Sequence, residues 1–160
     1  MSPFLSKGEE KMGYIVLGMF VFILDIMTKL AVELNMFDKS IPIIENVFHL
    51  TYVENRGIAF GMFGDARYLF IIISFIVLIA LVYMYSKTTN RSKYLRVGTA
   101  LIFGGACGNL LERIAKGFVV DFLDFRVFPV FNFADVAICI GAALLIIHFI
   151  FFDNKKEEEN

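Results

Sequence analysis

The stretch that decides the fold is GGACGNLLERIAKGFVVDFLDFRVFPVFNFAD, residues 104–135. It begins with small residues at the end of one apolar run and continues with polar side chains beyond that run. The next apolar run begins at Asp135. Asp121 lies fourteen positions earlier, among valine and phenylalanine side chains. Because a charged group near hydrocarbon costs on the order of 2.5–3.5 kcal/mol, acids in such places indicate a functional site. The stretch therefore predicts a catalytic carboxylate pair, Asp121 and Asp135.

The composition of the whole chain is typical of a membrane protein. Of the 160 residues, 58% are hydrophobic and only 19% are charged, whereas soluble domains are about 45–50% apolar. Apolar runs of about 20 residues are long enough to cross the bilayer core as helices. We predict an all-α membrane protein with four transmembrane helices in a single polytopic domain, residues 1–160, with spans at 13–34, 67–85, 94–111 and 136–152.

The connecting segments predict the topology. The loop at 86–93 and the residues that follow it are basic and contain no acid, which indicates a cytoplasmic location. Both termini are then cytoplasmic, and the loops at 35–66 and 112–135 lie outside. The 35–66 segment is rich in β-branched and aromatic residues and ends in glycines, which favours short strands. We expect a small β-like cradle after the first helix, on the bilayer surface or against the bundle.

Several polar residues lie inside or next to the predicted spans. Asp25 and Lys29 are four residues apart and share a helical face. They belong to the site, or they form a self-contained ion pair with Lys29 extended to the membrane interface. Arg113 shares a face with Asn109 and can bind a carboxylate through two parallel hydrogen bonds. Asp135 has a structural alternative as the N-cap of the fourth helix.

Other chemistries find little support in the sequence. His49 and His148 are predicted on opposite membrane faces, so no Ser–His pair forms. Cys107 and Cys139 lie in apolar runs, where cysteine packs as a small hydrophobe. The spacing of acids, histidines and cysteines matches no metal site, and we expect neither metal nor cofactor. Two neighbouring carboxyls instead share one proton, and such a pair can activate water and protonate a leaving amine.

Two non-hydrolytic functions are alternatives. A proton-coupled transporter could use Asp25, Asp121 and Asp135 as a relay, but a relay needs acids at several depths, and these gather at one predicted face. A non-catalytic assembly protein would explain the glycines of the third span, because small residues allow close helix packing. It would leave the outer polar cluster without a role.

Five segments, in order, resemble bacterial lipoprotein signal peptidase (signal peptidase II), a family of four-span aspartyl proteases of the cytoplasmic membrane. They are DIMTK from residue 25, VENRGIAFG from 53, GGACGNLLERI from 104, VVDFLDF from 119 and FNFAD from 131. The resemblance extends from Met12 to Phe152. It implies that Asp121 and Asp135 are the catalytic dyad, and that the site is lined or supported by Asp25, Lys29, Asn55, Gly57, Gly108, Asn109, Arg113, Asn132 and Ala134.

The resemblance also implies the substrate and the setting. The family cleaves prolipoproteins before a cysteine that carries diacylglyceryl, near the extracytoplasmic face, and globomycin inhibits it. Membrane lipid is then the second partner, nucleic acid is not a partner, and we expect a monomer. The loop around Asn55 would be the cradle and flap that receive the substrate. Glu112 departs from the family, which usually has Asp there, and we expect a supporting role for the longer side chain.

Overall fold

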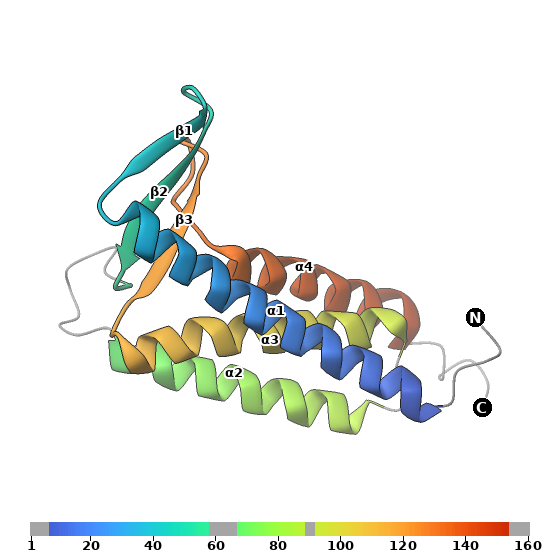
Figure 1. The fold of residues 1–160 in the computed structure, drawn as a ribbon. Coiled ribbons are helices and arrows are strands. Elements are labelled where there is room, and N and C mark those ends of the chain that lie inside the picture. Colours follow the sequence, from blue (N-terminus) through green and yellow to red (C-terminus); the bar gives the residue numbers. More distant parts are fainter. Residues whose placement is uncertain (1–6, 58–66, 89–91, 154–160) are drawn as a thin grey trace, which may run out of the picture.

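The computed structural model describes residues 7–57, 67–88 and 92–153. Within these ranges, helices form a bundle and strands form a small sheet at one end of it (Figure 1). The helices are α1 (Lys7–Met36), α2 (Arg67–Lys87), α3 (Lys93–Ala115) and α4 (Phe133–His148), which a π-helical turn (Phe149–Asp153) continues. The strands are β1 (Ser40–Ile44), β2 (Phe48–Asn55) and β3 (Val119–Asp124).

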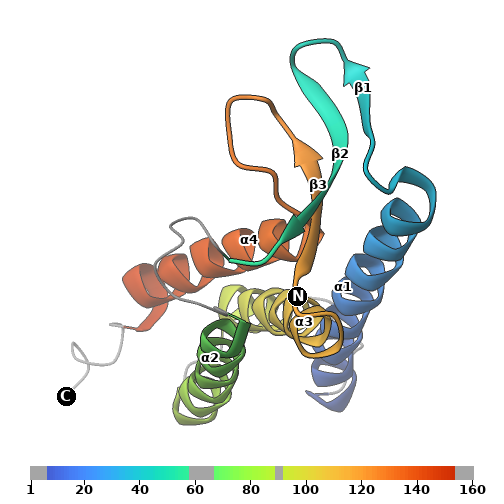
Figure 2. The same cartoon turned by 90° about the vertical axis from the view of Figure 1, so that its left-hand side faces the viewer.

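Helix α3 occupies the centre of the bundle, with α1, α2 and α4 around it (Figure 2). Its glycines allow backbones to approach closely, as small residues do between membrane helices. A Cβ at Gly98 would come within 2.7 Å of the carbonyl oxygen of Gly141, and one at Gly105 within 2.6 Å of that of Ala134. The contact between α3 and α4 therefore depends on the absence of these side chains.

Three of the described helices are long and apolar enough to cross a membrane: Met12–Met36, Arg67–Lys87 and Phe133–Phe152. Large apolar side chains on their outer faces are exposed, such as Phe20 at 60% and Ile79 at 67%. A surface of this kind requires lipid as its solvent. Helix α3 is 23 residues long but is interrupted by glycines and charged residues, so its hydropathy alone does not mark it as a span.

The predicted helices are present, and each extends beyond its approximate predicted span; two of these extensions lie at the same end as the sheet. Helix α3 continues to Ala115, which places Glu112 and Arg113 in its last turns rather than in a loop. Helix α4 begins at Phe133 rather than at Val136, because Asn132 caps it. His148 lies at the far end of α4, where it is fully buried and its Nδ1 is 3.0 Å from the hydroxyl of Ser92.

The sheet is antiparallel, in the order β1-β2-β3. The strands β1 and β2 confirm the prediction for the first part of the 35–66 segment, while residues 58–66 lie outside the described ranges. The third strand, β3, was not predicted. It pairs with β2 through Val53 and Asp121, and it packs on the end of α1 through a cluster formed by Val32, Met36, Val120 and Phe122. This packing holds the sheet directly above the helix bundle.

Candidate active site

Asp121 lies on β3, 2% exposed, between two asparagine side chains. The amide of Asn55 donates to its Oδ2 at 2.8 Å, and the amide of Asn132 donates to its Oδ1 at 2.6 Å. Asn55 is oriented in turn, because its Oδ1 accepts the backbone N–H of Gly57 at 2.8 Å. Gly57 has φ 74°, a conformation that favours glycine. The end of β2 thus aims a polar group at Asp121.

Asp135 lies in the first turn of α4 and forms a capping box with Asn132. The side chain of Asn132 accepts the backbone N–H of Asp135 at 3.0 Å, and Oδ2 of Asp135 accepts the backbone N–H of Asn132 at 3.2 Å. The proposed N-cap role of Asp135 was therefore wrong, since the cap is Asn132. The Oδ1 of Asp135 accepts a further hydrogen bond from the amide of Asn109 at 2.9 Å.

Asn132 is the residue that joins the two aspartates. Its amide bonds the carboxylate of Asp121, while its oxygen and backbone N–H bond Asp135. It is completely buried. Asp121 of β3 and Asp135 of α4 are therefore both held by the same residue. The spacing of the two aspartates in the sequence was compatible with this arrangement but did not establish it.

A buried ion pair lies behind this centre. The ammonium of Lys29 donates to Asp25 and to Asn109, both at 2.7 Å, and neither Lys29 nor Asp25 is more than 1% exposed. The second oxygen of Asp25 accepts the backbone N–H of Ala134 at 2.9 Å. The alternative in which Lys29 reaches the membrane interface was wrong. The pair connects α1 to Asp135 through Asn109.

Glu112 connects the same network to β3. Its Oε2 accepts the backbone N–H of Val120 at 2.9 Å and lies 3.5 Å from the ammonium of Lys29. Its Oε1 accepts from Lys116 at 3.0 Å, and Lys116 also pairs with Glu33. Sequence reasoning did not include Lys116 or Glu33. The four-residue spacing of Glu112 and Lys116 was the available signal.

Arg113 does not bind a carboxylate as expected. Among the described residues it forms no ion pair within 4 Å, and its guanidinium lies over the ring of Phe70, 5.2 Å from the centroid. Its NH1 is 3.4 Å from the carbonyl oxygen of Asn109. Gly108 has a steric role, because a Cβ at this position would overlap the carboxylate of Asp25.

The surroundings of Asp121 raise the pKa of its carboxyl group. Burial raises its pKa from 3.8 to about 6, and the negative charge of Asp135 acts in the same direction, against the hydrogen bonds from Asn55 and Asn132. The rings of Phe122 and Phe133, with centroids 5.7 Å apart, contribute apolar cover. Among the described residues, no group of three or more His, Cys, Asp or Glu could hold a metal ion.

Fold and site together define a helical membrane protein with a buried polar centre where its bundle meets a small sheet. The chain belongs to the signal peptidase II family, whose model matches residues 17–151. It is 54% identical to a lipoprotein signal peptidase of Halothermothrix orenii, covering 86% of this chain and 94% of that protein. It is 44% identical to one from Clostridioides difficile, covering 91% and 99%. A bacterial membrane enzyme solved by the in meso method at 1.9 Å superposes with a TM-score of 0.81 at 35% identity, covering 88% of this chain and 94% of that one.

Proposed function

We propose that this chain is an aspartyl endopeptidase that removes signal peptides from prolipoproteins by cleaving before a cysteine modified with diacylglyceryl. Membership of the signal peptidase II family supports the class of reaction, and the relatives named as lipoprotein signal peptidases support the substrate. The observation that carries the aspartyl mechanism is the buried Asn132, which holds both Asp121 and Asp135.

The proposed chemistry uses the pair with one proton. Asp135 accepts N–H bonds at the N-terminus of α4, where negative charge is favoured. It removes a proton from water as the water oxygen bonds to the scissile carbonyl carbon. Asp121 holds the single proton of the pair and donates it to the leaving nitrogen as the C–N bond breaks, so that the new amine leaves neutral. The apolar surroundings exclude competing water from the pair.

The remaining predicted site residues divide into two groups by their contacts. Asn55 and Asn132 bond the catalytic carboxyls directly, as does Asn109. The others act behind them by orienting these groups or by leaving space, and they are Asp25, Lys29, Gly57, Gly108, Glu112, Arg113 and Ala134. The loop around Asn55, proposed as the cradle and flap, is described as far as Gly57, and its residues 58–66 lie outside the described ranges.

The proposed setting is the bacterial cytoplasmic membrane, with α3 as a fourth span in a single domain. At about 1.5 Å per residue, its 23 residues extend about 34 Å, enough for the hydrocarbon core. The other three helices surround α3 (Figure 2), and its Asn109 and Glu112 are buried. Both termini are then cytoplasmic, the aspartates face outward, and the enzyme acts as a monomer among lipids.

The test is cleavage of a diacylglyceryl-modified lipobox peptide by the purified protein in detergent. Wild type should cut before the lipidated cysteine, while Asp121→Asn and Asp135→Asn should lose activity and remain folded. Asp38→Asn is the matched control, because Asp38 is exposed at φ 56°, a conformation that Asn also adopts. Substantial turnover by either dyad variant would reject the assignment. If the wild type is folded but does not cleave the peptide, the endopeptidase proposal fails. Proton transport by the protein should then be measured.

A further inference from the structure

Four side chains of alternating charge form a line from the surface of the protein to the candidate active site. In order, they are Glu33 of α1, Lys116 at the end of α3, Glu112 of α3 and Lys29 of α1. The exposed fraction of these side chains falls along the line, from 27% and 30% for the first two to 5% and 1% for the last two. One end of the line is therefore exposed, while the other lies behind Asp135.

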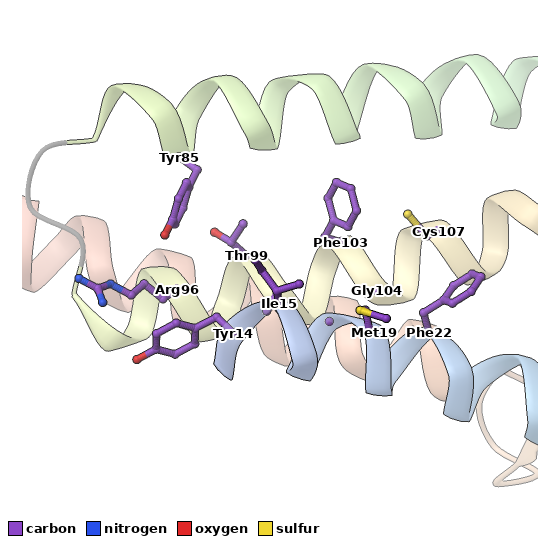
Figure 3. Close-up of a pocket in the computed structure, with 12 residues that line it drawn as sticks. Tyr14, Ile15, Met19, Phe22, Tyr85, Arg96, Thr99, Phe103, Gly104 and Cys107 are labelled. Atoms are coloured by element: carbon purple, nitrogen blue, oxygen red, sulfur yellow. The ribbon is translucent and has the colours of Figure 1, made fainter. Parts of the chain in front are cut away.

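This charged line is separate from the groove that lies between α1 and α2, over α3 (Figure 3). The α3 residues that line the groove extend from Arg96 to Cys107, and most of its wall is apolar. Glu112 and Lys116 lie further along α3, at the end of the bundle that carries the sheet (Figure 1). The charged line therefore belongs to the region in which α3 leads into β3.

Glu112 divides its two carboxylate oxygens between the charged line and β3. Its Oε1 accepts a hydrogen bond from Lys116 at 3.0 Å, and its Oε2 accepts the backbone N–H of Val120 at 2.9 Å. Val120 is fully buried on a strand at one edge of the sheet, and a buried N–H needs an acceptor. Because Val120 directly precedes Asp121, this bond fixes the backbone next to the first aspartate.

Lys116 provides the closer of two cations at Glu112. The Oε2 of Glu112 also lies 3.5 Å from the ammonium of Lys29, which already donates two hydrogen bonds at 2.7 Å. Without Lys116, the nearly buried carboxylate would have only Lys29 as a cation within 4 Å among the described residues. Since a buried charge needs a close partner, the carboxylate would turn toward Lys29 and away from Val120.

We propose that Lys116 is a positioning residue for Asp121. Its ammonium holds the Glu112 carboxylate on the N–H of Val120, and Glu33 restrains the long lysine side chain by pairing with the same ammonium. The lysine follows the glutamate by four residues near the end of a helix, an order that favours the pair. The effect on catalysis rests on the proposed peptidase function, whereas the effect on the backbone at Val120 does not.

Amide hydrogen exchange by NMR and the kinetics of peptide cleavage, both on the full chain in detergent, test this proposal. Lys116→Met should raise the exchange rate of the Val120 amide about tenfold, the lower end of what a hydrogen bond to a charged group contributes. The amide of Ile102, in the buried part of α3, should exchange as in wild type. The same variant should lower kcat about tenfold and leave KM unchanged. Lys116→Arg should restore most of both values, because it keeps the charge.

Lys93→Met is the matched control, since Lys93 is exposed at the opposite end of α3, and it should change neither exchange nor cleavage. Glu33→Gln removes only the exposed end of the charged line, so it should change exchange at Val120 and kcat by about twofold in the same directions as Lys116→Met. This milder variant keeps the proposal falsifiable if Lys116→Met does not fold.

Unchanged exchange at Val120 in Lys116→Met would overturn the proposal. Equally faster exchange at Val120 and Ile102 would do the same, because it would show a general loss of stability. Faster exchange at Val120 with an unchanged kcat would also overturn it, as would a raised KM alone, which would indicate contact with the substrate. If wild type does not cleave, the proposed function is rejected, and exchange at Val120 still decides whether Lys116 holds this backbone.

Discussion

The carboxylate of Asp25 accepts the backbone N–H of Ala134 at 2.9 Å, across 109 positions of sequence. The N–H groups of the first helical turn have no partner within the helix, and here α1 supplies one for α4. Because Ala134 directly precedes Asp135, this bond fixes the start of α4 and the position of the second aspartate. Lys29, paired with Asp25 at 2.7 Å, keeps that acceptor in place.

Breaking the Asp25–Lys29 pair from one side should destabilise the protein strongly. Asp25→Ala leaves the Lys29 ammonium buried without its anionic partner at 2.7 Å, and the loss should be about 3–5 kcal/mol. Lys29→Met should cost a similar amount. The double variant Asp25→Ala/Lys29→Met should lose less than the sum of the two, because neither charge remains. Denaturant unfolding in detergent measures all three, and strictly additive losses would contradict the coupling.

Asn132 allows its capping role to be separated from its contact with Asp121. Asn132→Ser keeps an N-cap of similar strength but removes the amide that donates to Asp121. Its melting temperature should stay near that of wild type, while kcat falls about tenfold to a hundredfold, the value of a hydrogen bond to a charged group.

Asn132→Ala should show the same loss of kcat and a further loss of about 1 kcal/mol in stability, because the cap is also removed. Single-turnover cleavage and thermal unfolding of the two variants make the comparison. If Asn132→Ser cleaves at the wild-type rate, the contact with Asp121 has no part in the chemistry.

Hydropathy was sufficient to predict where α1, α2 and α4 lie, because each contains a long apolar run. It could not predict β3. Four consecutive residues of that strand are buried, Val119–Phe122, so the alternation that marks a half-buried strand is missing. The valines and phenylalanine after Gly117 were the remaining signal.

The sequence indicated which residues gather at the candidate site, but not how they contact one another. The sequence left two interpretations of Asp25, a role at the site or an ion pair with Lys29, and the structure shows the ion pair together with a bond from the backbone N–H of Ala134. The orientation of Arg113 depends on Phe70, which is distant in sequence, and no local pattern encodes it. The N-cap could have been assigned correctly, since Asn132 and Asp135 have the spacing of a capping box.

The raised pKa of Asp121 predicts the pH dependence of cleavage. With a pKa of about 6 in the free enzyme, the group is protonated below that pH and ionised above it. The proposed active form carries one proton, so kcat/KM should fall by about tenfold per pH unit above about 6. Bound substrate excludes more water and raises the pKa further, so the corresponding fall in kcat should lie at higher pH. Rates of peptide cleavage from pH 5 to about 9 test this, and a kcat/KM that rises with pH would contradict it.

Gly108 provides the last prediction, because its lack of a side chain leaves room for the Asp25 carboxylate. Gly108→Ala should displace that carboxylate from Ala134 and Lys29, and should lower both stability and kcat by disturbing the start of α4. Gly13→Ala is the matched control in α1, where a Cβ would meet nothing within 4 Å. It should gain about 0.5–1 kcal/mol from reduced chain entropy and leave cleavage unchanged. Equal effects of the two alanines on unfolding and on cleavage would show that Gly108 matters only for helix propensity.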